Sequence, residues 1–214
     1  MPVKLGYWAI RGLAQPIRLL LTYCGDEFEE KRYDGANRQT WTDEKFSLGL
    51  PLPNLPYLID GDIKIVQSNA ILRYIGRKHN LDGSTEQEKV LVDIFENQVM
   101  DMRNAFVRLC YGPSSSFEAG KKTYLEESLP ATLKKISDQL GSSKWVAGEN
   151  ITFPDFHLAE MLSQHVIFSP TCLDAYPNLK EYLARFEELP AIKAYKASDK
   201  CIHRPINNPS ASFH

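Results

Sequence analysis

Residues 54–74 constrain the fold of this chain most strongly, because a hairpin signal is followed directly by a helix signal. The dipeptide Asp60-Gly61 separates two short apolar segments, 57–59 and 63–65, and is typical of a tight β-hairpin turn. Ser68 stands before an apolar helical pattern and is a candidate N-cap, and free N–H groups at such a helix start attract an anion. The stretch predicts an extended edge before the hairpin and an anion pocket after it, which together suit a small, extended, peptide-like acid.

The remainder of the N-terminal part alternates strand and helix signals. The expected elements are a strand at 3–7, a helix at 15–24 and an edge strand at 29–33. Gly25 directly after the helix is the expected stop. Residues 34–53 are polar, and we expect an irregular loop there, anchored by Trp41 and Phe46. The order β-α-β-loop-β-β-α predicts a small mixed sheet with helices packed on it, which is the α/β class.

Beyond residue 84 the apolar residues follow a helical period only. Residues 85–111 form a long amphipathic pattern, about 40 Å at the rise of an α-helix. Further helices are expected at about 118–140, 152–168, 177–188 and 190–198. Thr152 and Asp155 have the spacing of a capping box. The chain is therefore predicted to contain an α/β domain over 1–83 and an all-α helical bundle over 84–214.

Composition and charge argue against several classes of partner. The chain has 214 residues, of which 43% are hydrophobic and 24% charged, and its net charge is −2. Such a balance provides no positive field for nucleic acid or an anionic membrane. We find no apolar run near the ~20 residues that span a bilayer and no signal-peptide pattern at the N-terminus. We therefore expect a cytoplasmic protein without nucleic-acid or membrane partners.

The cysteines and histidines show no metal-binding pattern. The four cysteines are far apart in the sequence and form no C-x-x-C motif: Cys24, Cys110, Cys172 and Cys201. We expect them to be free thiols, mostly buried, in a reducing compartment. The five histidines lack a partner at ligand spacing, so we expect no metal site.

Several separate motifs resemble those of the glutathione transferases, and of the Mu class in particular. They run in order through nearly the whole chain: Gly6–Leu21, Phe46–Leu50, Pro53–Tyr57, Gln67–Ile71, Glu96–Asp101, Leu109–Tyr111, Cys172–Leu179 and Leu183–Glu187. The resemblance implies a thioredoxin-like first domain and a helical second domain that forms most of an electrophile pocket. It also implies a homodimer, glutathione as co-substrate without a further cofactor, and a cis Leu55–Pro56 bond.

Tyr7 is the catalytic residue that the resemblance implies. The reaction is attack of the glutathione thiol on an electrophilic carbon, and a free thiol with a pKa of roughly 8.5 is mostly protonated at neutral pH. A phenol that donates a hydrogen bond to the charged sulfur would lower this pKa, and a shift of ~2 units takes about 2.7 kcal/mol. Taken alone, a tyrosine at a strand end is more often a packing residue.

The resemblance also assigns residues that hold glutathione. Trp8 and Leu13 line the pocket beside the thiol, the Leu55 backbone pairs with the cysteinyl residue as an added strand, and Asn54 makes a nearby polar contact. Gln67 and Ser68 hold the γ-glutamyl carboxylate, and Asp101 reaches its α-amino group across the dimer. The glycyl carboxylate is assigned to Arg38, Trp41 and Lys45. On sequence alone, Ser68 is more readily interpreted as a plain N-cap. The 38–45 segment could equally be a solvated loop with one buried tryptophan.

The electrophile pocket is expected to be lined by residues of both domains. They are Ile10, Leu13, Met100, Asn104, Val107, Tyr111 and Asn207. Tyr111 is a possible second hydrogen-bond donor. Asn104, Asn207 and Asn208 stand where the family often has methionine or an aromatic residue, which predicts a wetter pocket. Leu52 stands where many Mu-class enzymes have an aromatic dimer anchor, so we expect a weaker contact there.

Two other functions remain open from the sequence. The same fold could serve as a non-catalytic ligand carrier or structural protein, although the site residues are all present and no insertion is seen. The chain could also be a glutathione-dependent isomerase of one lipid, since the polar pocket residues would suit a narrower substrate. The resemblance favours a detoxifying transferase over both alternatives.

Overall fold

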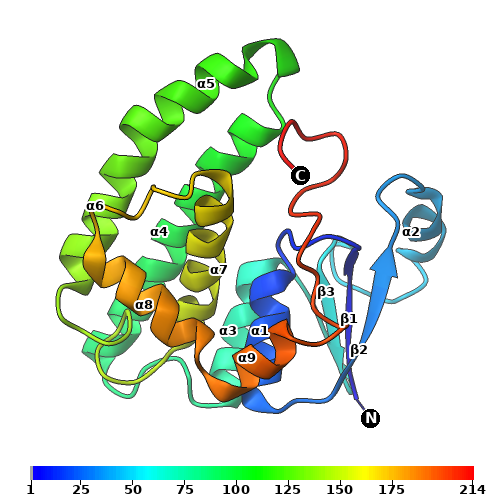
Figure 1. Cartoon of the computed structure of the whole chain (residues 1–214). Helices are drawn as coiled ribbons and strands as arrows, with labels where there is room; N and C mark the ends of the chain where they lie inside the picture. The colour runs from blue at the N-terminus through cyan, green and yellow to red at the C-terminus, as the bar shows by residue number, and fades with distance from the viewer. Residues whose placement is uncertain (1) are drawn as a thin grey trace. The chain divides into compact units, whose positions relative to one another are not determined.

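Four strands form one mixed sheet in the computed structural model, which describes residues 2–214. The strands are β1 (Val3–Trp8), β2 (Phe28–Tyr33), β3 (Tyr57–Asp60) and β4 (Ile63–Val66), in the spatial order β2-β1-β3-β4 (Figure 1). β1 runs parallel to β2 and antiparallel to β3, and β3 pairs with β4 as a hairpin. The predicted strands, the hairpin and the edge position of β2 are confirmed.

The hairpin and the helix that follows it form one unit, as the sequence predicts. The turn closes with Asp60 opposite Ile63, and Gly61 has the positive φ of +59° that such a turn needs. The Asp60 carboxylate accepts hydrogen bonds from Lys78 Nζ at 2.8 Å and Tyr74 Oη at 2.9 Å, both on α3 (Ser68–Lys78). These contacts, chiefly that with Lys78, lower the pKa of Asp60 below its ordinary value. The turn is thereby tied to the helix.

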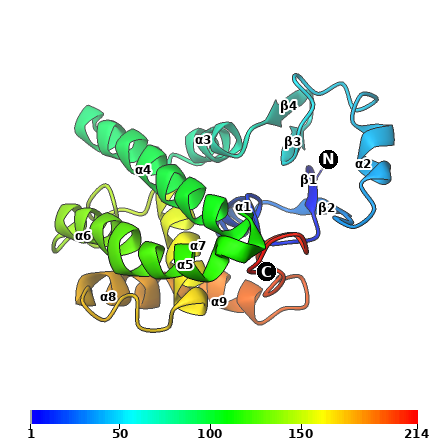
Figure 2. The same cartoon turned by 90° about the horizontal axis from the view of Figure 1, so that it is seen from above.

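The helices α1 (Gln15–Cys24) and α3 cover one side of the sheet, and α2 (Gln39–Glu44) lies on the other (Figure 2). α1 ends at Gly25, whose backbone is left-handed, as predicted. α1 contacts α3 and also α9 (Pro190–Lys196). The core between sheet and helices is apolar and includes Leu5, Ile17, Leu20, Leu58, Ile71 and Leu72, all with 0% exposure.

The segment expected to be an irregular loop contains a helix, so that expectation was wrong. α2 has six residues, of which only Trp41 is buried. One apolar residue in a single turn and a half is too little to produce a helical period, and the helix is stabilised instead by the aromatic contacts of Trp41. The anchoring role predicted for Trp41 is confirmed, whereas Phe46 is 75% exposed and anchors nothing in this chain.

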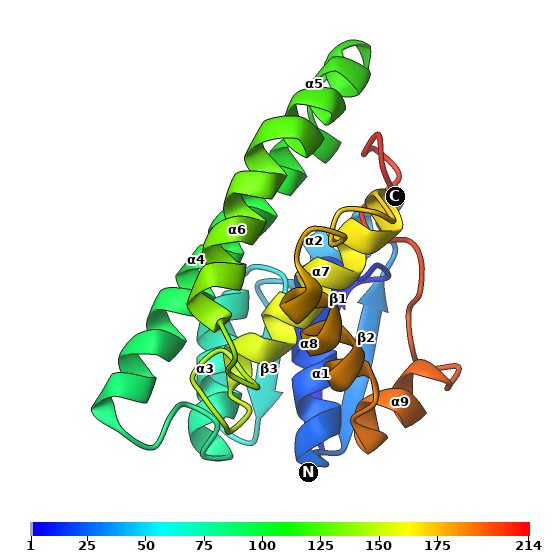
Figure 3. The same cartoon turned by 60° about the vertical axis from the view of Figure 1, so that its left-hand side comes forward.

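The second compact unit is helical throughout its regular structure. Its helices are α4 (Glu86–Cys110), a 3₁₀ turn at Ser114–Ser116, α5 (Phe117–Thr123), a π-helical turn at Tyr124–Ser128, α6 (Leu129–Leu140), α7 (Phe153–Phe168) and α8 (Pro177–Glu187). α4 contacts both α5 and α7 (Figure 3). The long helix begins at a capping box formed by Thr85 and Glu88. The expected helices are confirmed.

α7 is the central helix of this unit, since 13 of its 16 residues are buried. The predicted cap is present: the Asp155 carboxylate accepts from the Thr152 N–H at 2.7 Å and from the Thr152 hydroxyl at 3.0 Å. It also accepts from the Val146 N–H at 3.0 Å and the Tyr182 hydroxyl at 2.9 Å. Burial nevertheless raises the pKa of Asp155 to about 6. Thus one side chain joins the start of α7, the preceding loop and α8.

The compact units differ from the predicted domains, 1–83 and 84–214, at the boundary and at the C-terminal end. The first comprises the chain through His79 together with Pro190–Pro209 and His214, and the second comprises Asn80–Leu189 and Ser210–Phe213. α9 and the chain through Pro209 therefore belong to the unit that contains the sheet, and α9 packs on α1. Among residues 2–214, no helix has both the length and the apolar character to cross a membrane.

Candidate functional site

Tyr7 lies near the end of β1 and packs in a buried cluster with Trp41 and Tyr57. Its side chain is 5% exposed. Its hydroxyl oxygen accepts a hydrogen bond from the Leu13 N–H at 3.1 Å. A phenol oxygen that accepts an N–H can still donate its own proton, and the accepted bond orients that O–H. The Leu13 N–H thus fixes the position of Tyr7 Oη beside the loop that follows β1.

Gly12 makes this geometry possible. Its φ is +44°, and a Cβ at this position would lie 2.6 Å from Tyr7 Oη and 2.6 Å from a Tyr7 ring carbon. A side chain would therefore clash with the phenol as well as strain the backbone. Sequence reasoning missed this residue, although a glycine between Arg11 and Leu13 in an otherwise ordered loop was an available signal.

Trp41 is held by two tyrosines of the sheet. Its ring stacks on that of Tyr57, with centroids 6.1 Å apart and planes at 20°, and meets Tyr33 edge-on at 5.4 Å. The hydroxyls of Tyr33 and Tyr57 share a hydrogen bond at 3.2 Å, and Tyr33 Oη also donates to Glu44 at 3.1 Å. Burial is the main reason that the pKa of Tyr33 is raised. The cluster fixes α2 on the sheet.

Arg38 and Lys45 lie at the two ends of α2, where the sequence expectation had a loop. Arg38 is the N-cap residue and Lys45 the C-cap residue, so both flank Trp41. Lys45 Nζ lies 4.6 Å above the ring centroid of the exposed Phe46. The structure therefore brings together the three residues predicted for one carboxylate on a single short helix, with two positive charges beside a buried indole.

The Leu55–Pro56 bond is cis, as the resemblance implied. Asn54 Oδ1 accepts the Leu55 N–H at 2.9 Å. In the structure the Asn54 side chain thus bonds its own backbone neighbour, and its contact with glutathione stays a prediction. A peptide that adds to this edge as a strand must replace that bond with its own.

The interpretation of Ser68 as an N-cap is wrong. Gln67 occupies the cap position with a φ of +74°, and it makes no side-chain capping bond. Ser68 is the first helical residue, and it is 7% exposed. The positive φ of Gln67 turns the chain into α3 in a way that the residue type did not indicate. The first N–H groups of α3 thus meet no capping side chain from Gln67, which suits an anion better than a capped start.

The residues predicted on α4 share one face of that helix. Met100, Asn104, Val107 and Tyr111 follow a four-three-four spacing, which places them in one row. Tyr111 is 40% exposed, and Asp101 and Asn104 are exposed as well. In the first unit, by contrast, Ile10 is 5% and Asn207 4% exposed, so these two are interior rather than surface residues.

The cysteines are free, as predicted, but only Cys110 is fully buried. The other three are half-buried, so the expectation of mostly buried thiols was wrong. Burial raises the pKa of Cys24 to about 12 and that of Cys172 to about 11, which keeps both protonated at neutral pH. Among residues 2–214, no group of three or more His, Cys, Asp and Glu side chains is placed to hold a metal ion.

Comparisons with known proteins agree along the whole chain. The glutathione S-transferase N-terminal domain family matches residues 3–77, and the C-terminal domain family matches residues 100–199. The chain is 54% identical to glutathione S-transferase Mu 4 of Mus musculus over 218 aligned positions, covering 100% of this chain and 99% of that protein. It is 55% identical to glutathione S-transferase Mu 3 of Homo sapiens, covering 98% and 94%.

Solved structures give the same result. The crystal structure of the glutathione S-transferase Blo t 8 has a TM-score of 0.91 and 37% identity, covering 97% of this chain and 98% of that one. A Pi-class glutathione S-transferase of Onchocerca volvulus has a TM-score of 0.89 and 34% identity, covering 99% and 100%.

Proposed function

The chain belongs to the Mu-class glutathione S-transferases, and from this premise we propose which of its residues carry the reaction. It is an enzyme that conjugates glutathione, with a thioredoxin-like N-terminal sheet and a helical C-terminal part. The roles of individual residues, the assembly and the location of the protein are proposals. The observation that supports the role of Tyr7 most directly is the contact between its Oη and the Leu13 N–H.

Tyr7 is the residue that activates the thiol. The Leu13 N–H occupies one lone pair of the phenol oxygen, and the O–H donates to the sulfur when glutathione binds. An N–H bond to the phenol oxygen also favours the donation of its proton, because hydrogen bonds in a chain polarise one another. A charge-assisted bond of this kind stabilises the thiolate more than the thiol and lowers its pKa.

The glutathione backbone is proposed to lie along the edge formed by residues 54–68. The Leu55 backbone binds the cysteinyl residue as an added strand, and Asn54 releases that N–H on binding. The γ-glutamyl carboxylate lies at the start of α3, with Gln67 and Ser68. The glycyl carboxylate is bound by Arg38 and Lys45 at the two ends of α2, with Trp41 between them. Trp8 and Leu13 pack beside the thiol.

A homodimer is proposed from exposed apolar side chains. Leu52 is 82% and Phe46 75% exposed in the first unit, and Ile94 is 56% exposed on α4. Exposed apolar side chains mark a partner surface when they form a patch, and we infer that a second subunit covers these three. In such a dimer Asp101 would bind the α-amino group of glutathione held by the other subunit. Leu52 buries less area than an aromatic anchor, so dissociation on dilution, followed by light scattering, should occur at micromolar rather than far lower concentration.

The row of Met100, Asn104, Val107 and Tyr111 is proposed to contact the electrophile, and the family resemblance assigns Ile10, Leu13 and Asn207 to the electrophile as well. The exposed Asn104 favours polar electrophiles. A lipid isomerase or a ligand carrier is the alternative, and a panel of aryl halides, epoxides, enones and isothiocyanates separates the three. The near-neutral net charge of −2 is in keeping with a cytoplasmic enzyme.

The experiment that tests this proposal is Tyr7→Phe, assayed with glutathione and an aryl halide. We expect kcat/KM to fall at least about tenfold, as one pKa unit of lost thiolate stabilisation requires, while glutathione affinity stays nearly unchanged. Tyr74→Phe is the matched control, because it removes a phenol of the same unit that bonds only Asp60 among the contacts described above. Equal turnover in Tyr7→Phe and wild type would remove Tyr7 from the mechanism.

A further inference from the structure

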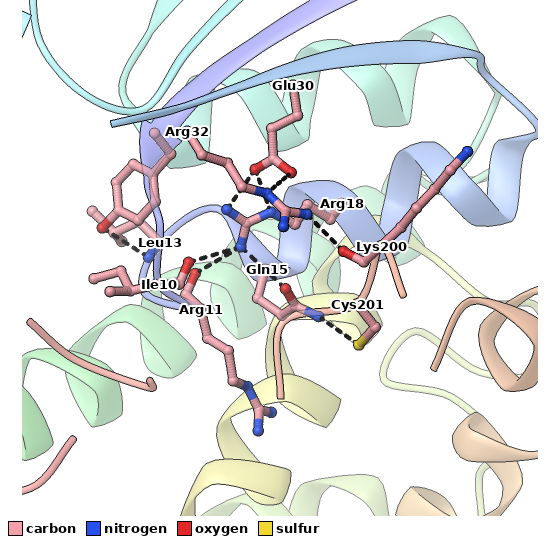
Figure 4. A network of polar contacts seen from close by, with 10 residues as sticks. Ile10, Arg11, Leu13, Gln15, Arg18, Glu30, Arg32, Lys200 and Cys201 are labelled. Carbon is pink, nitrogen blue, oxygen red and sulfur yellow. Dashed lines mark hydrogen bonds and ion pairs between the residues drawn. The ribbon is translucent and has the colours of Figure 1, made fainter. Parts of the chain in front are cut away.

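Arg18 is a charged residue at the buried centre of a polar network in the first unit (Figure 4). Its side chain has 0% exposure although it is charged, and it lies in a run of apolar residues on α1. Its Nε donates to Glu30 Oε1 at 2.7 Å, and its Nη2 lies 2.6 Å from the same oxygen as an ion-pair contact. Removing a guanidinium from water costs several kcal/mol without a partner. Glu30 on β2 is that partner.

The other end of the guanidinium binds the loop between β1 and α1. Nη1 donates to the carbonyl oxygens of Ile10 at 2.9 Å and Arg11 at 3.3 Å, and to Gln15 Oε1 at 3.1 Å (Figure 4). A planar guanidinium can bind a carboxylate on a strand through Nε and Nη2 and loop carbonyls through Nη1 at the same time. A lysine ammonium lacks this fixed arrangement of donors. Arg18 therefore links β2 to the loop that precedes its own helix.

The backbone N–H groups of the same loop are hydrogen-bonded as well. The N–H groups of Ile10, Arg11 and Gly12 donate to the carbonyl oxygens of Trp8, Pro205 and Ile206, at 2.7, 2.9 and 3.1 Å. The next N–H, that of Leu13, donates to Tyr7 Oη at 3.1 Å. Successive buried N–H groups need acceptors, and three of these four are backbone carbonyls. The fourth is the phenol.

We propose that Arg18 is a positioning residue of the transferase reaction. By holding the carbonyls of Ile10 and Arg11 against β2, it fixes where the Leu13 N–H points and thereby orients the Tyr7 phenol toward the sulfur. Arg18 touches neither glutathione nor the sulfur in this scheme. The proposal rests on the proposed role of Tyr7. It adds that thiolate stability depends on a buried ion pair on the far side of the loop.

The test is Arg18→Lys in the full-length enzyme, with the pKa of bound glutathione thiol as the readout. Lysine keeps the charge but cannot bind Glu30 and two loop carbonyls together, so we expect the thiol pKa to rise by about one unit. At about pH 6.5 kcat/KM then falls about fivefold, and the loss shrinks to less than about twofold near pH 9, where the thiol is ionised in both proteins. Damage to folding alone would lower activity at every pH and leave the thiol pKa unchanged.

Arg32→Met is the matched control. Arg32 donates to the second oxygen of the same carboxylate, Glu30 Oε2, at 2.8 Å, and to the Lys200 carbonyl. None of its described contacts is with residues 10–13. We expect this variant to keep the wild-type thiol pKa. A folded Arg18→Lys enzyme with an unchanged thiol pKa, or a control that shifts equally, would overturn the proposal.

Two further variants, Glu30→Gln and Tyr7→Phe, separate the possible outcomes of this test. If Arg18→Lys yields no folded protein, Glu30→Gln is tested instead. Glutamine has nearly the size of glutamate but no charge, so the ion pair with Arg18 is weakened. An unchanged thiol pKa in Glu30→Gln would then overturn the proposal. Tyr7→Phe is measured alongside. A shift in Tyr7→Phe without one in the Arg18 or Glu30 variant overturns the role of Arg18 alone, whereas no shift in Tyr7→Phe overturns the role of Tyr7 and this inference with it.

Discussion

Two buried charged side chains, one in each compact unit, solve the same physical problem with different consequences. Asp155 at the start of α7 is satisfied by Thr152, Val146 and Tyr182, all within the second unit. Arg18 on α1 is satisfied by Glu30 and by the loop of residues 10–13 that carries the donor to Tyr7. We expect a buried charge to serve stability where its partners are only structural, and function where one partner is the loop that bonds Tyr7.

The largest effect is expected from Asp155→Ala. It removes four hydrogen bonds to buried or partly buried groups and leaves the cap of the central helix unmade. We expect a loss of about 3–4 kcal/mol in the free energy of unfolding, measured by urea denaturation. Because the partners of Asp155 are structural, kcat/KM of the folded fraction should stay within about twofold of wild type. A large fall in kcat/KM without destabilisation would break the distinction between the two regions.

Gly12→Ala is expected to affect activity more than stability, the opposite of Asp155→Ala. The added Cβ meets Tyr7 Oη at 2.6 Å, and the φ of +44° disfavours alanine. Displacing the phenol should lower kcat/KM about a hundredfold, which corresponds to about 2.7 kcal/mol of transition-state stabilisation. Steady-state kinetics with an aryl halide measures this. The control is Gly25→Ala at the end of α1, where φ is also positive, at +73°, but no atom lies within 4 Å of the added Cβ. Comparable activity of both variants would contradict the role given to Gly12.

A smaller, pH-dependent effect on the free energy of unfolding is expected at His165, a buried group whose described partners are structural. Its ring is fully buried, bonds Tyr124 Oη at 2.7 Å and the Met161 carbonyl at 2.6 Å, and burial lowers its pKa to about 4. The unfolded chain binds this proton near pH 6.5, whereas the folded chain resists it down to about 4, so acid favours unfolding in that window.

We therefore expect the stability advantage of wild type over His165→Gln to shrink by about 2 kcal/mol between about pH 7 and pH 5. Urea denaturation of both proteins at each pH measures it. Taking the difference removes the opposite trend of Asp155, whose raised pKa is common to both proteins. An advantage that stays constant or grows as the pH falls would show that His165 is protonated in the folded state.

Local signals explain what could be predicted from the sequence. The turn at Asp60-Gly61, the glycine stop after α1 and the capping pattern of Thr152 and Asp155 each depend on neighbouring residues, and all three are present. Tyr7, Trp41 and Lys45 are assigned to the site through matched motifs, and their roles stay predictions. The structure adds how Trp41 is held, by stacking on Tyr57.

What could not be predicted depends on contacts distant in the sequence or on unusual backbone. The short helix α2 is held by Tyr33 and Tyr57 rather than by its own pattern. The cap position of α3 has a φ of +74° at Gln67, which its residue type does not indicate. The partner of Arg18 is 12 residues away on another strand. A lone arginine within the apolar face of α1 was the one available sign of it.

The most direct test of the central claim is the pKa of the thiol of glutathione bound to the wild-type enzyme, followed by ultraviolet difference spectroscopy across a pH series. If the phenol oriented by the Leu13 N–H stabilises the thiolate, the bound thiol should titrate near pH 6.5, about two units below its free value of roughly 8.5. A thiol that still titrates near its free value at saturating glutathione would contradict the account.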